Sequence, residues 1–287
     1  MITQFCICVI LILILIYLTY KKQNKFNKEF FSSNTEYSTS KKSSNNFSIK
    51  NNSILPDINK LFVISLDTDT GAKKWKSMQN TILGDRLTKF TGVYGKLLNI
   101  EHPKYNNLIK RDWDYGSWKY GRRDIVEMSD SELGCCLSHF NVWNKVVEDD
   151  IDVAMILEDD AIRYNKKFID ITDDIIKTAP KNWDIILLGF MIPNRYLKDE
   201  TKVGDFYKVK EFVLAHSYLI SNKGANKLIH KTPINAPIDT WMSLQSPTVN
   251  IYRHNYIVTN KNLIQSNLVA QSDTVGKGEI EHTNHIF

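Results

Sequence analysis

Short apolar runs bounded by polar residues recur along the chain after about residue 58. Their length and aliphatic composition are typical of buried strands, and the runs occupy residues 61–66, 153–157, 183–189 and 212–220. Between and after these runs, apolar residues recur with a spacing close to the helical period. This spacing predicts helices at residues 131–149, 166–179 and 222–231. Strands that alternate with helices predict an α/β fold whose mixed sheet is mostly parallel.

The predicted helices have recognisable start and stop signals. Ser129 and Glu132 have the spacing of a capping box, in which each side chain bonds the backbone N–H of the other residue. Pro180 and Pro233 follow the two later helices, and proline ends a helix because it lacks an N–H and its ring clashes with the preceding turn.

Residues 1–20 form an almost wholly apolar stretch without a charged side chain. As a helix this stretch would measure about 30 Å, which is the thickness of the hydrocarbon core of a bilayer. A cleaved signal peptide has a basic start and a small-residue cleavage site, and this stretch has neither. We therefore expect an uncleaved N-terminal transmembrane helix and a single-pass membrane protein.

Residues 21–57 are rich in Lys, Asn, Ser and Thr and too polar to bury a core. They predict a flexible stem before a folded domain at 58–287, although a disordered tail without a spacer role fits equally well. The four Lys between residues 21 and 28 favour a cytoplasmic C-terminal domain. Glycosylation sequons at Asn46 and Asn51 favour the opposite side. The side of the membrane therefore stays open, as does the choice between an endoplasmic reticulum or Golgi membrane and a viral or bacterial one.

The net charge of +5 would by itself suggest nucleic acid or an anionic surface as a partner. Its distribution changes that interpretation. Residues 21–60 contain eight Lys and three acidic residues, whereas residues 61–287 contain 29 basic and 29 acidic residues. The folded part is therefore neutral, which argues against a surface that follows phosphates and predicts no nucleic-acid partner. The basic excess lies beside the predicted anchor, where Lys can meet lipid headgroups.

Glu158, Asp159 and Asp160 follow directly on an apolar strand. Adjacent carboxylates repel one another unless a cation lies among them, and oxygen ligands suit Mg²⁺ or Mn²⁺. Alternate residues of an extended segment point the same way, so Glu158 and Asp160 can share a face. The end of a strand in an open α/β sheet is also where ligands usually bind. A solvated acidic turn is the alternative.

Several blocks together resemble glycosyltransferase family 25, which includes bacterial lipooligosaccharide galactosyltransferases and procollagen galactosyltransferases. The family pattern has a Gly-Cys-x-x-Ser-His helix and then an apolar strand that ends in Glu-Asp-Asp. The matching blocks stand in the family order at residues 62–67, 131–143, 154–161, 184–189, 215–225 and 237–239. Each block alone is weak evidence, and it is their order and spacing that give the resemblance its weight.

The resemblance implies a GT-A-like nucleotide-sugar-binding domain. It implies an inverting transfer of a hexose, often galactose, from a nucleotide sugar such as UDP-galactose to a hydroxyl of a glycan or protein acceptor. By the same resemblance, Glu158 and Asp160 would bind Mn²⁺ or Mg²⁺, and Asp159 would lie close to the sugar or ribose of the donor. The metal would neutralise the charge of the departing nucleotide.

An inverting transfer also needs a general base for the acceptor hydroxyl. Asp239 is our candidate, because it matches the Pro-x-Asp of the family in Pro237–Ile238–Asp239. A helix N-cap is an equally good interpretation of this residue, since Asp-Thr precedes the apolar run that begins at Trp241.

His139 and Arg86 are further candidates for contact with the donor. For His139 the alternative is a core histidine, and for Arg86 it is a surface arginine. The family often has arginines after its first strand, where this chain has Lys73 and Lys74, and Lys cannot form a two-pronged contact with phosphate. The adjacent cysteines at 135 and 136 are interpreted as core residues, because a bridge between neighbours would be strained.

The sequence leaves an alternative from a different functional class. A catalytically inactive member of the family could act as a binding or adhesion module, although the intact acidic motif argues against it. A phosphoryl-transfer or nucleic-acid-binding protein is less consistent with the residues, because the chain has no glycine-rich phosphate loop that ends in Lys-Ser or Lys-Thr.

Overall fold

The computed structural model describes residues 54–114, 125–164, 167–191, 200–257 and 264–265. The predicted anchor and nearly all of the predicted stem lie outside these ranges. Within them, no helix combines the length and the apolar character that a membrane crossing requires. Leu55 is only 1% exposed, so the folded part begins at least three residues before the predicted boundary at residue 58.

The secondary structure of the described residues alternates between strands and helices over most of the chain. Its first half consists of β1 (Lys60–Ser65), α2 (Asp69–Gln79), η1 (Gly84–Arg86), β2 (Leu87–Thr91), η2 (Gly95–Leu97), η3 (Pro103–Tyr105), β3 (Asp112–Asp114), β4 (Ile125–Glu127), α3 (Asp130–Glu148) and β5 (Val153–Glu158). The second half consists of β6 (Arg163–Tyr164), α4 (Phe168–Thr178), β7 (Ile185–Met191), β8 (Thr201–Val203), β9 (Phe206–Lys208), β10 (Val213–Ser221), α5 (Asn222–Ile229), α6 (Ile238–Leu244), β11 (Ile251–His254) and β12 (Ile264–Gln265). The predicted strands and helices all occur, with ends shifted by a few residues at most.

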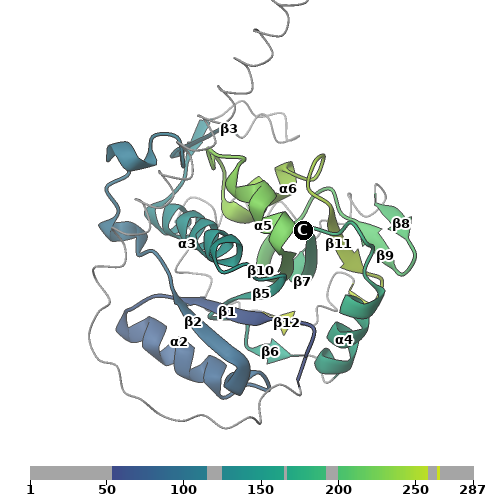
Figure 1. The fold of residues 1–287 in the computed structure, drawn as a ribbon. Coiled ribbons are helices and arrows are strands. Elements are labelled where there is room, and N and C mark those ends of the chain that lie inside the picture. The colour runs from purple at the N-terminus through teal and green to yellow at the C-terminus, as the bar shows by residue number, and fades with distance from the viewer. Residues whose placement is uncertain (1–53, 115–124, 165–166, 192–199, 258–263, 266–287) are drawn as a thin grey trace, which may run out of the picture. The chain divides into compact units, whose positions relative to one another are not determined.

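One eight-stranded sheet forms the centre of the fold, in the order β2-β1-β5-β10-β7-β11-β9-β8. Helices α3, α5 and α6 lie on one side of it and α2 lies on the other (Figure 1). The side chains of β5 and β7 are almost all buried, which explains why these strands appear in the sequence as continuous apolar runs. The α/β class and the mixed sheet are thereby confirmed.

The sheet is less parallel than predicted. β1 pairs in parallel with β2 and β5, and β7 with β11, but the other four pairings of this sheet are antiparallel. The difference comes mainly from β10, which lies antiparallel between β5 and β7. Parallel neighbours need a long crossover, usually a helix. The described part of the connection before β10, residues 200–212, contributes β8 and β9 instead.

Helix α3 is the central helix of the fold and is buried around most of its circumference. It begins with the predicted capping box, in which Ser129 Oγ accepts from the N–H of Glu132 and Glu132 Oε2 accepts from the N–H of Ser129. A Cβ atom on Gly134 would lie 2.6 Å from the carbonyl oxygen of Val93, so only glycine allows this close approach. One turn later, Ser138 Oγ accepts from the N–H of Val93 at 2.8 Å. The Gly and Ser of the Gly-Cys-x-x-Ser-His pattern thus hold the loop after β2 against α3.

The start of the folded part is held by Arg86. Its guanidinium donates to the carbonyl oxygens of Ile54, Leu55 and Ile58, the last at 2.6 Å. Burial lowers the pKa of Arg86. The side chains of Leu55 and Ile58 are buried, so these hydrogen bonds fix the backbone of a segment that packs into the core.

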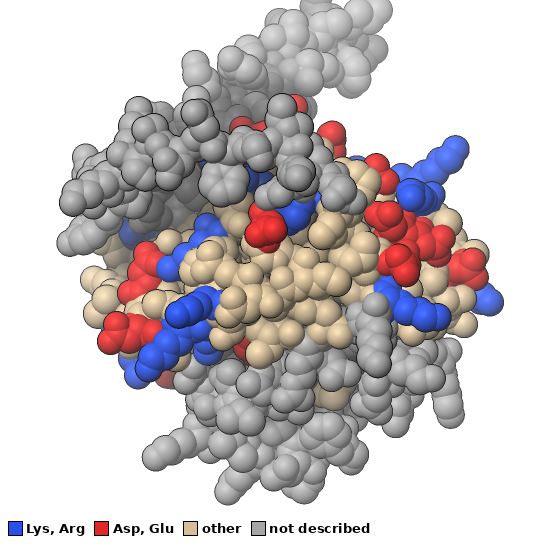
Figure 2. All heavy atoms as spheres, turned by 90° about the horizontal axis from the view of Figure 1, so that it is seen from below, with Lys and Arg blue, Asp and Glu red and all other residues tan. Residues whose placement is uncertain are grey.

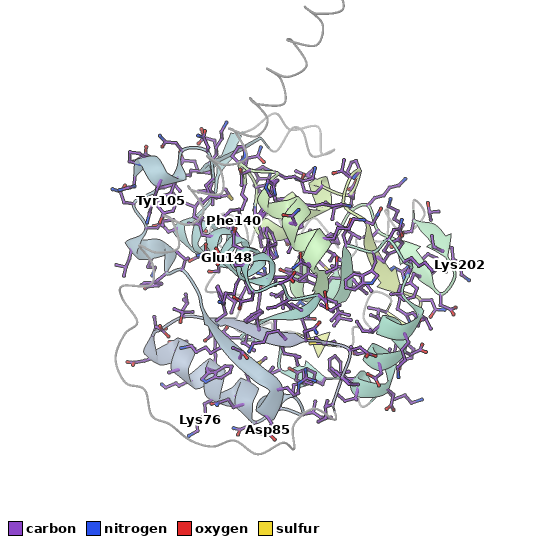
Figure 3. The ribbon with its side chains drawn as sticks, in the orientation of Figure 1. Lys76, Asp85, Tyr105, Phe140, Glu148 and Lys202 are labelled. Carbon is purple, nitrogen blue, oxygen red and sulfur yellow. The ribbon has the colours of Figure 1, made fainter. Side chains whose placement is uncertain are left out.

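The surface of the described part carries both signs of charge. On the face that Figure 2 shows, basic and acidic side chains are interspersed around an uncharged centre. Lys76, Asp85 and Lys202 are exposed and project outward from α2, η1 and β8, whereas Phe140 of α3 is buried (Figure 3). The described residues of this face agree with the neutral balance of residues 61–287 and form no strongly basic patch.

Candidate functional site

The acidic motif lies where the sequence predicts it, at the carboxyl end of β5. Glu158 is the last residue of that strand and stands opposite Ile64 near the end of β1. The chain then turns, with the N–H of Ala161 donating to the carbonyl oxygen of Glu158 at 3.1 Å. The side chain of Glu158 is 34% exposed, so this carboxylate is accessible to a ligand from solvent.

Asp160 and Asp159 have more enclosed positions than Glu158. Asp160 is 8% exposed, and its buried Oδ1 has no hydrogen-bond partner within the described part of the chain. Burial, reinforced by the charge of Glu158, raises the pKa of Asp160 to about 7. Asp159 forms an ion pair of 3.5 Å with Lys74 of α2, although burial still raises its pKa. Lys74 therefore partly offsets the negative charge of the motif.

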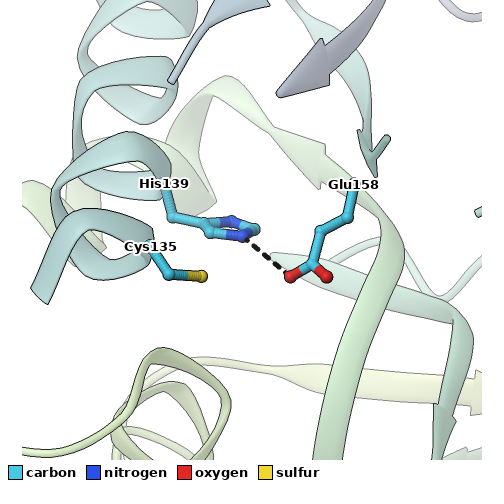
Figure 4. A group of neighbouring side chains, drawn as sticks. All are labelled: Cys135, His139 and Glu158. Carbon is cyan, nitrogen blue, oxygen red and sulfur yellow. Dashed lines mark hydrogen bonds and ion pairs between the residues drawn. The ribbon is translucent and has the colours of Figure 1, made fainter. Parts of the chain in front are cut away.

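Helix α3 brings two further side chains to Glu158. Cys135 and His139 are four residues apart and therefore share one face of the helix. His139 Nε2 lies 3.4 Å from Glu158 Oε1, and Cys135 points toward the same carboxylate (Figure 4). The sulfur, one ring nitrogen and one carboxylate oxygen of these three residues all lie within 4.8 Å of one another. Cys135 is thus not simply a core residue, whereas Cys136 is buried with its sulfur 3.5 Å from the carbonyl oxygen of Ala236.

The other side of the His139 ring is anchored by β10. Its Nδ1 lies 2.8 Å from the hydroxyl of Tyr218, which also accepts a hydrogen bond of 2.8 Å from Trp143 Nε1. The rings of His139 and Tyr218 are stacked with their centroids 5.8 Å apart. Burial raises the pKa of Tyr218 well above its ordinary value, so the hydroxyl stays protonated. This anchoring orients Nε2 toward Glu158.

Asp239 lies in the first turn of α6, and both of its carboxylate oxygens accept backbone hydrogen bonds. Oδ2 accepts from the N–H of Leu214 and Oδ1 from the N–H of Thr240, each at 2.7 Å. Burial raises the pKa of Asp239, and the charge of Glu158 adds to this shift. The N-cap of α6 is Pro237, so the alternative prediction of Asp239 as the N-cap is wrong. Leu214 has a φ of 60°, a conformation that is uncommon outside glycine.

The residues present at the strand end fit a hard divalent cation. The buried Oδ1 of Asp160 lacks a partner among the described residues, and buried carboxylate oxygens normally have one. A cation would satisfy this oxygen and relieve the repulsion between Glu158 and Asp160. Carboxylate oxygens are the ligands that Mg²⁺ and Mn²⁺ prefer.

The structure brings together most of the residues that the sequence indicated. Glu158, Asp159 and Asp160 are consecutive, and His139 contacts Glu158. Asp239 is near enough for the charge of Glu158 to raise its pKa. Arg86 is the exception. It precedes β2 at the amino ends of the parallel strands, whereas Glu158 lies at their carboxyl ends. Its guanidinium binds the segment 54–58, so Arg86 does not lie with the other predicted site residues.

Sequence reasoning missed three participants in this arrangement. Tyr218 and Trp143 orient His139, and Cys135 stands beside it. A signal was present for two of them, because Cys135, His139 and Trp143 follow one another at intervals of four residues, the spacing of one helix face. Nothing local in the sequence pairs Tyr218 with them, because that contact joins residues 79 positions apart.

Comparisons with known proteins agree with this arrangement. The model of the family described as glycosyltransferase family 25 (LPS biosynthesis protein) matches residues 58–242. Procollagen galactosyltransferase 1-A of Xenopus laevis is 31% identical over 162 residues, which are 52% of this chain and 25% of the relative. Procollagen galactosyltransferase 2 of Homo sapiens is 27% identical over 161 residues, or 52% and 24% of the two chains.

Two further similarities complete the comparison. A protein of Rattus norvegicus named probable inactive glycosyltransferase 25 family member 3 is 26% identical over 40% of this chain and 21% of its own length. Among solved structures, a cytidylyltransferase from Leptospira borgpetersenii superposes with a TM-score of 0.37 and 10% identity, covering 79% and 95% of the two chains.

The alignments with the two galactosyltransferases span only about a quarter of those relatives. The family model, by contrast, covers well over half of this chain and includes the acidic strand end, the helix of His139 and Asp239. The chain therefore belongs to glycosyltransferase family 25.

Proposed function

We propose that this protein is a metal-dependent, inverting hexosyltransferase with a GT-A-like domain. It transfers galactose from UDP-galactose to a hydroxyl group of a glycan or protein. The observation that carries the proposal is the carboxyl end of β5, where Glu158 is accessible and a buried oxygen of Asp160 has no hydrogen-bond partner among the described residues. The names of the related procollagen galactosyltransferases support the sugar and the reaction type.

In this proposal the carboxylates at the end of β5 hold the cation and orient the donor. Glu158 and Asp160 are the ligands, and Mn²⁺ or Mg²⁺ bound there would neutralise the charge that develops on the departing nucleotide. Asp159, already paired with Lys74, stands next to both ligands and contacts the donor sugar or ribose. His139 is held by Tyr218 and keeps Glu158 in place through its Nε2 atom.

Asp239 is the general base of the proposed reaction. It accepts the proton of the acceptor hydroxyl as that oxygen attacks the anomeric carbon. Two backbone N–H groups fix its carboxylate, so the group does not have to be ordered when the acceptor arrives. Burial raises its pKa and thus makes it a stronger base than an exposed aspartate.

The proposal includes the predicted membrane attachment. Residues 1–20 anchor the protein, residues 21–57 form the stem, and the transferase domain acts close to the bilayer surface. The apolar length of the N-terminal segment and the Lys residues that follow it support this arrangement.

The test uses the full-length protein in detergent micelles with a panel of UDP-sugars. UDP release and sugar transfer are measured with Mn²⁺, with Mg²⁺ and with a chelator. We expect turnover of UDP-galactose that depends on the metal and falls at least about 100-fold in Glu158→Gln, because that change removes a charged ligand. The exposed Glu101→Gln is the matched control and keeps full activity. The absence of metal-dependent turnover with every donor would refute the proposal.

The second candidate function is an inactive binding or adhesion module. The rat relative that is named as probably inactive gives this candidate its specific support. The same panel separates the two functions, because an inactive module would bind UDP-galactose or a glycan without releasing UDP. Inversion is tested separately, by determining the anomeric configuration of the product with NMR.

A further inference from the structure

We propose that Cys135, His139 and Glu158 form a second metal site, specific for thiophilic divalent ions such as Zn²⁺, Co²⁺ and Cd²⁺. This site overlaps the proposed Mn²⁺ or Mg²⁺ site because both use Glu158. When a thiophilic ion is bound, Glu158 is therefore no longer available as a ligand for Mn²⁺ or Mg²⁺. The binding itself follows from the geometry alone, and only its effect on turnover rests on the proposed function.

The three side chains already stand close to the spacing that such an ion requires. Their ligand atoms lie within 4.8 Å of one another, and His139 Nε2 is 3.4 Å from Glu158 Oε1. In a tetrahedral zinc site with bonds of about 2.0–2.3 Å, neighbouring ligand atoms are about 3.3–3.8 Å apart. The present atoms are at most about 1 Å further apart than this, and we expect rotation of the Cys135 and Glu158 side chains to close the gap.

The imidazole is oriented as a metal ligand. The ligand histidines of metal sites usually hold their second ring nitrogen in a hydrogen bond to an outer group. Here the hydroxyl of Tyr218 occupies Nδ1 at 2.8 Å, so that Nε2 faces Cys135 and Glu158. Trp143 Nε1 donates to the same hydroxyl, and a second lone pair of the Tyr218 oxygen can accept a hydrogen bond from a protonated Nδ1. Nε2 is then free to bind an ion.

The ligand types decide which ions are preferred. A thiolate, an imidazole and a carboxylate together favour Zn²⁺ or Co²⁺ over Mg²⁺, which prefers oxygen ligands alone. When the ion binds, the S–H bond of Cys135 breaks, its proton passes to solvent and a sulfur lone pair forms the bond to the metal. Three protein ligands leave a fourth position open, unlike closed structural zinc sites with four. Cys135 is half-buried and Glu158 partly exposed, so an ion can enter from solvent.

Cobalt binding tests the site without reference to activity. Full-length protein in detergent micelles is titrated with Co²⁺ alone while the thiolate-to-cobalt charge-transfer absorbance is recorded. We expect a saturable band that Cys135→Ser abolishes and that Cys136→Ala retains, as does the Cys6→Ser/Cys8→Ser double variant. A band that persists in Cys135→Ser, or no band at excess Co²⁺, would overturn the proposal.

Two further variants keep the test decisive if Cys135→Ser does not fold. Glu158→Gln removes a ligand, and Tyr218→Phe removes the outer-shell partner of His139, which typically weakens metal affinity about 10- to 100-fold. Asp160→Asn alters only the hard-cation site, so it retains the cobalt band. Unchanged cobalt affinity in both Glu158→Gln and Tyr218→Phe would contradict the assignment.

The antagonism between the two sites is tested by inhibition. Zn²⁺ is added to the protein while Mn²⁺-dependent UDP release is measured. We expect inhibition whose half-maximal Zn²⁺ concentration rises at least about 10-fold in Cys135→Ser, since one of three ligands is lost. Equal inhibition of both proteins would refute the antagonism. If no donor is turned over, the proposed function fails while the cobalt titration still decides whether the metal site exists.

Discussion

The hydroxyl of Tyr218 lies 2.8 Å from Nδ1 of His139, and through this contact β10 determines the orientation of a side chain on α3. The same hydroxyl is the acceptor for the buried Nε1 of Trp143. One oxygen atom thus satisfies two buried ring nitrogens and directs the other nitrogen of His139 toward Glu158. A residue with no direct ionic role therefore sets the geometry of the candidate site.

Tyr218→Phe is expected to destabilise the protein by about 1–3 kcal/mol, because it leaves buried polar groups of Trp143 and His139 without their partner. The free energy of unfolding is measured by urea denaturation. Tyr252→Phe is the control, since the hydroxyl of Tyr252 bonds the side chain of the exposed Asn182, which water can satisfy. Equal losses of stability in the two variants would argue against the special position of Tyr218.

Asp239→Asn is expected to lower turnover about 10²- to 10⁴-fold, the usual contribution of a general base. The wild-type rate should fall as the pH decreases through the raised pKa of Asp239, because the protonated carboxyl cannot accept a proton. The pH profile of kcat/KM and the binding of UDP-galactose are measured for both proteins. The control is Asp205→Asn at an exposed site. Near-normal turnover of Asp239→Asn with purified protein would exclude the base assignment.

The pKa of Asp160, raised to about 7 by burial and by the charge of Glu158, has a consequence for stability. A carboxyl whose pKa is higher in the folded than in the unfolded protein stabilises the fold at low pH, and this stabilisation is lost as the pH rises through about 7. Metal-free Asp160→Asn should therefore exceed the wild type in stability at about pH 8, by an amount on the order of a few kcal/mol, and lose this advantage near pH 4.

Urea denaturation at several pH values, with a chelator present, measures this difference. Asp85→Asn at an exposed position is the control and should follow the wild type. Added Mn²⁺ should reduce the difference by stabilising the wild type, by about 2.7 kcal/mol at a concentration 100 times the Kd. A destabilised Asp160→Asn at high pH would show that the carboxylate has a structural partner instead.

Arg86→Lys distinguishes the structural role of this arginine from contact with the donor. Arg86 reaches the three carbonyl oxygens with two nitrogens, Nη1 and Nη2, and the single nitrogen of lysine cannot occupy both positions. The variant should therefore lose about 1–3 kcal/mol of stability. Its KM for UDP-galactose should stay within about twofold of the wild type, since Arg86 and Glu158 lie at opposite ends of the parallel strands. Arg111→Lys is the matched control, because Arg111 pairs with the exposed Asp130 and, within the described part of the chain, donates to only one backbone carbonyl oxygen, that of Met128. A large rise in KM with unchanged stability would show instead that Arg86 contacts the donor.

The sequence alone was enough to predict four strands of the sheet, three of the helices and the family, but not α2, α6 or the outer strands. The pattern of apolar residues located β5, β7 and α3, because a strand or helix face that packs into the core needs apolar side chains whatever its partners are. The capping box at Ser129 and Glu132 was also predictable, since its two partners are three residues apart. The acidic motif was recognisable because three adjacent carboxylates repel one another unless a cation or another positive group lies near them.

Only the tertiary structure decided what surrounds that motif. The antiparallel insertion of β10 places Tyr218 beside α3, and the turn before α6 brings Asp239 to the N–H of Leu214. These contacts join residues far apart in the chain, so no local pattern records them. The sequence by itself therefore determined the main buried strands and helices, the family and the acidic motif. Packing decided the partners of His139 and Arg86 and the position of Cys135, because side-chain partners depend on how the elements pack in three dimensions.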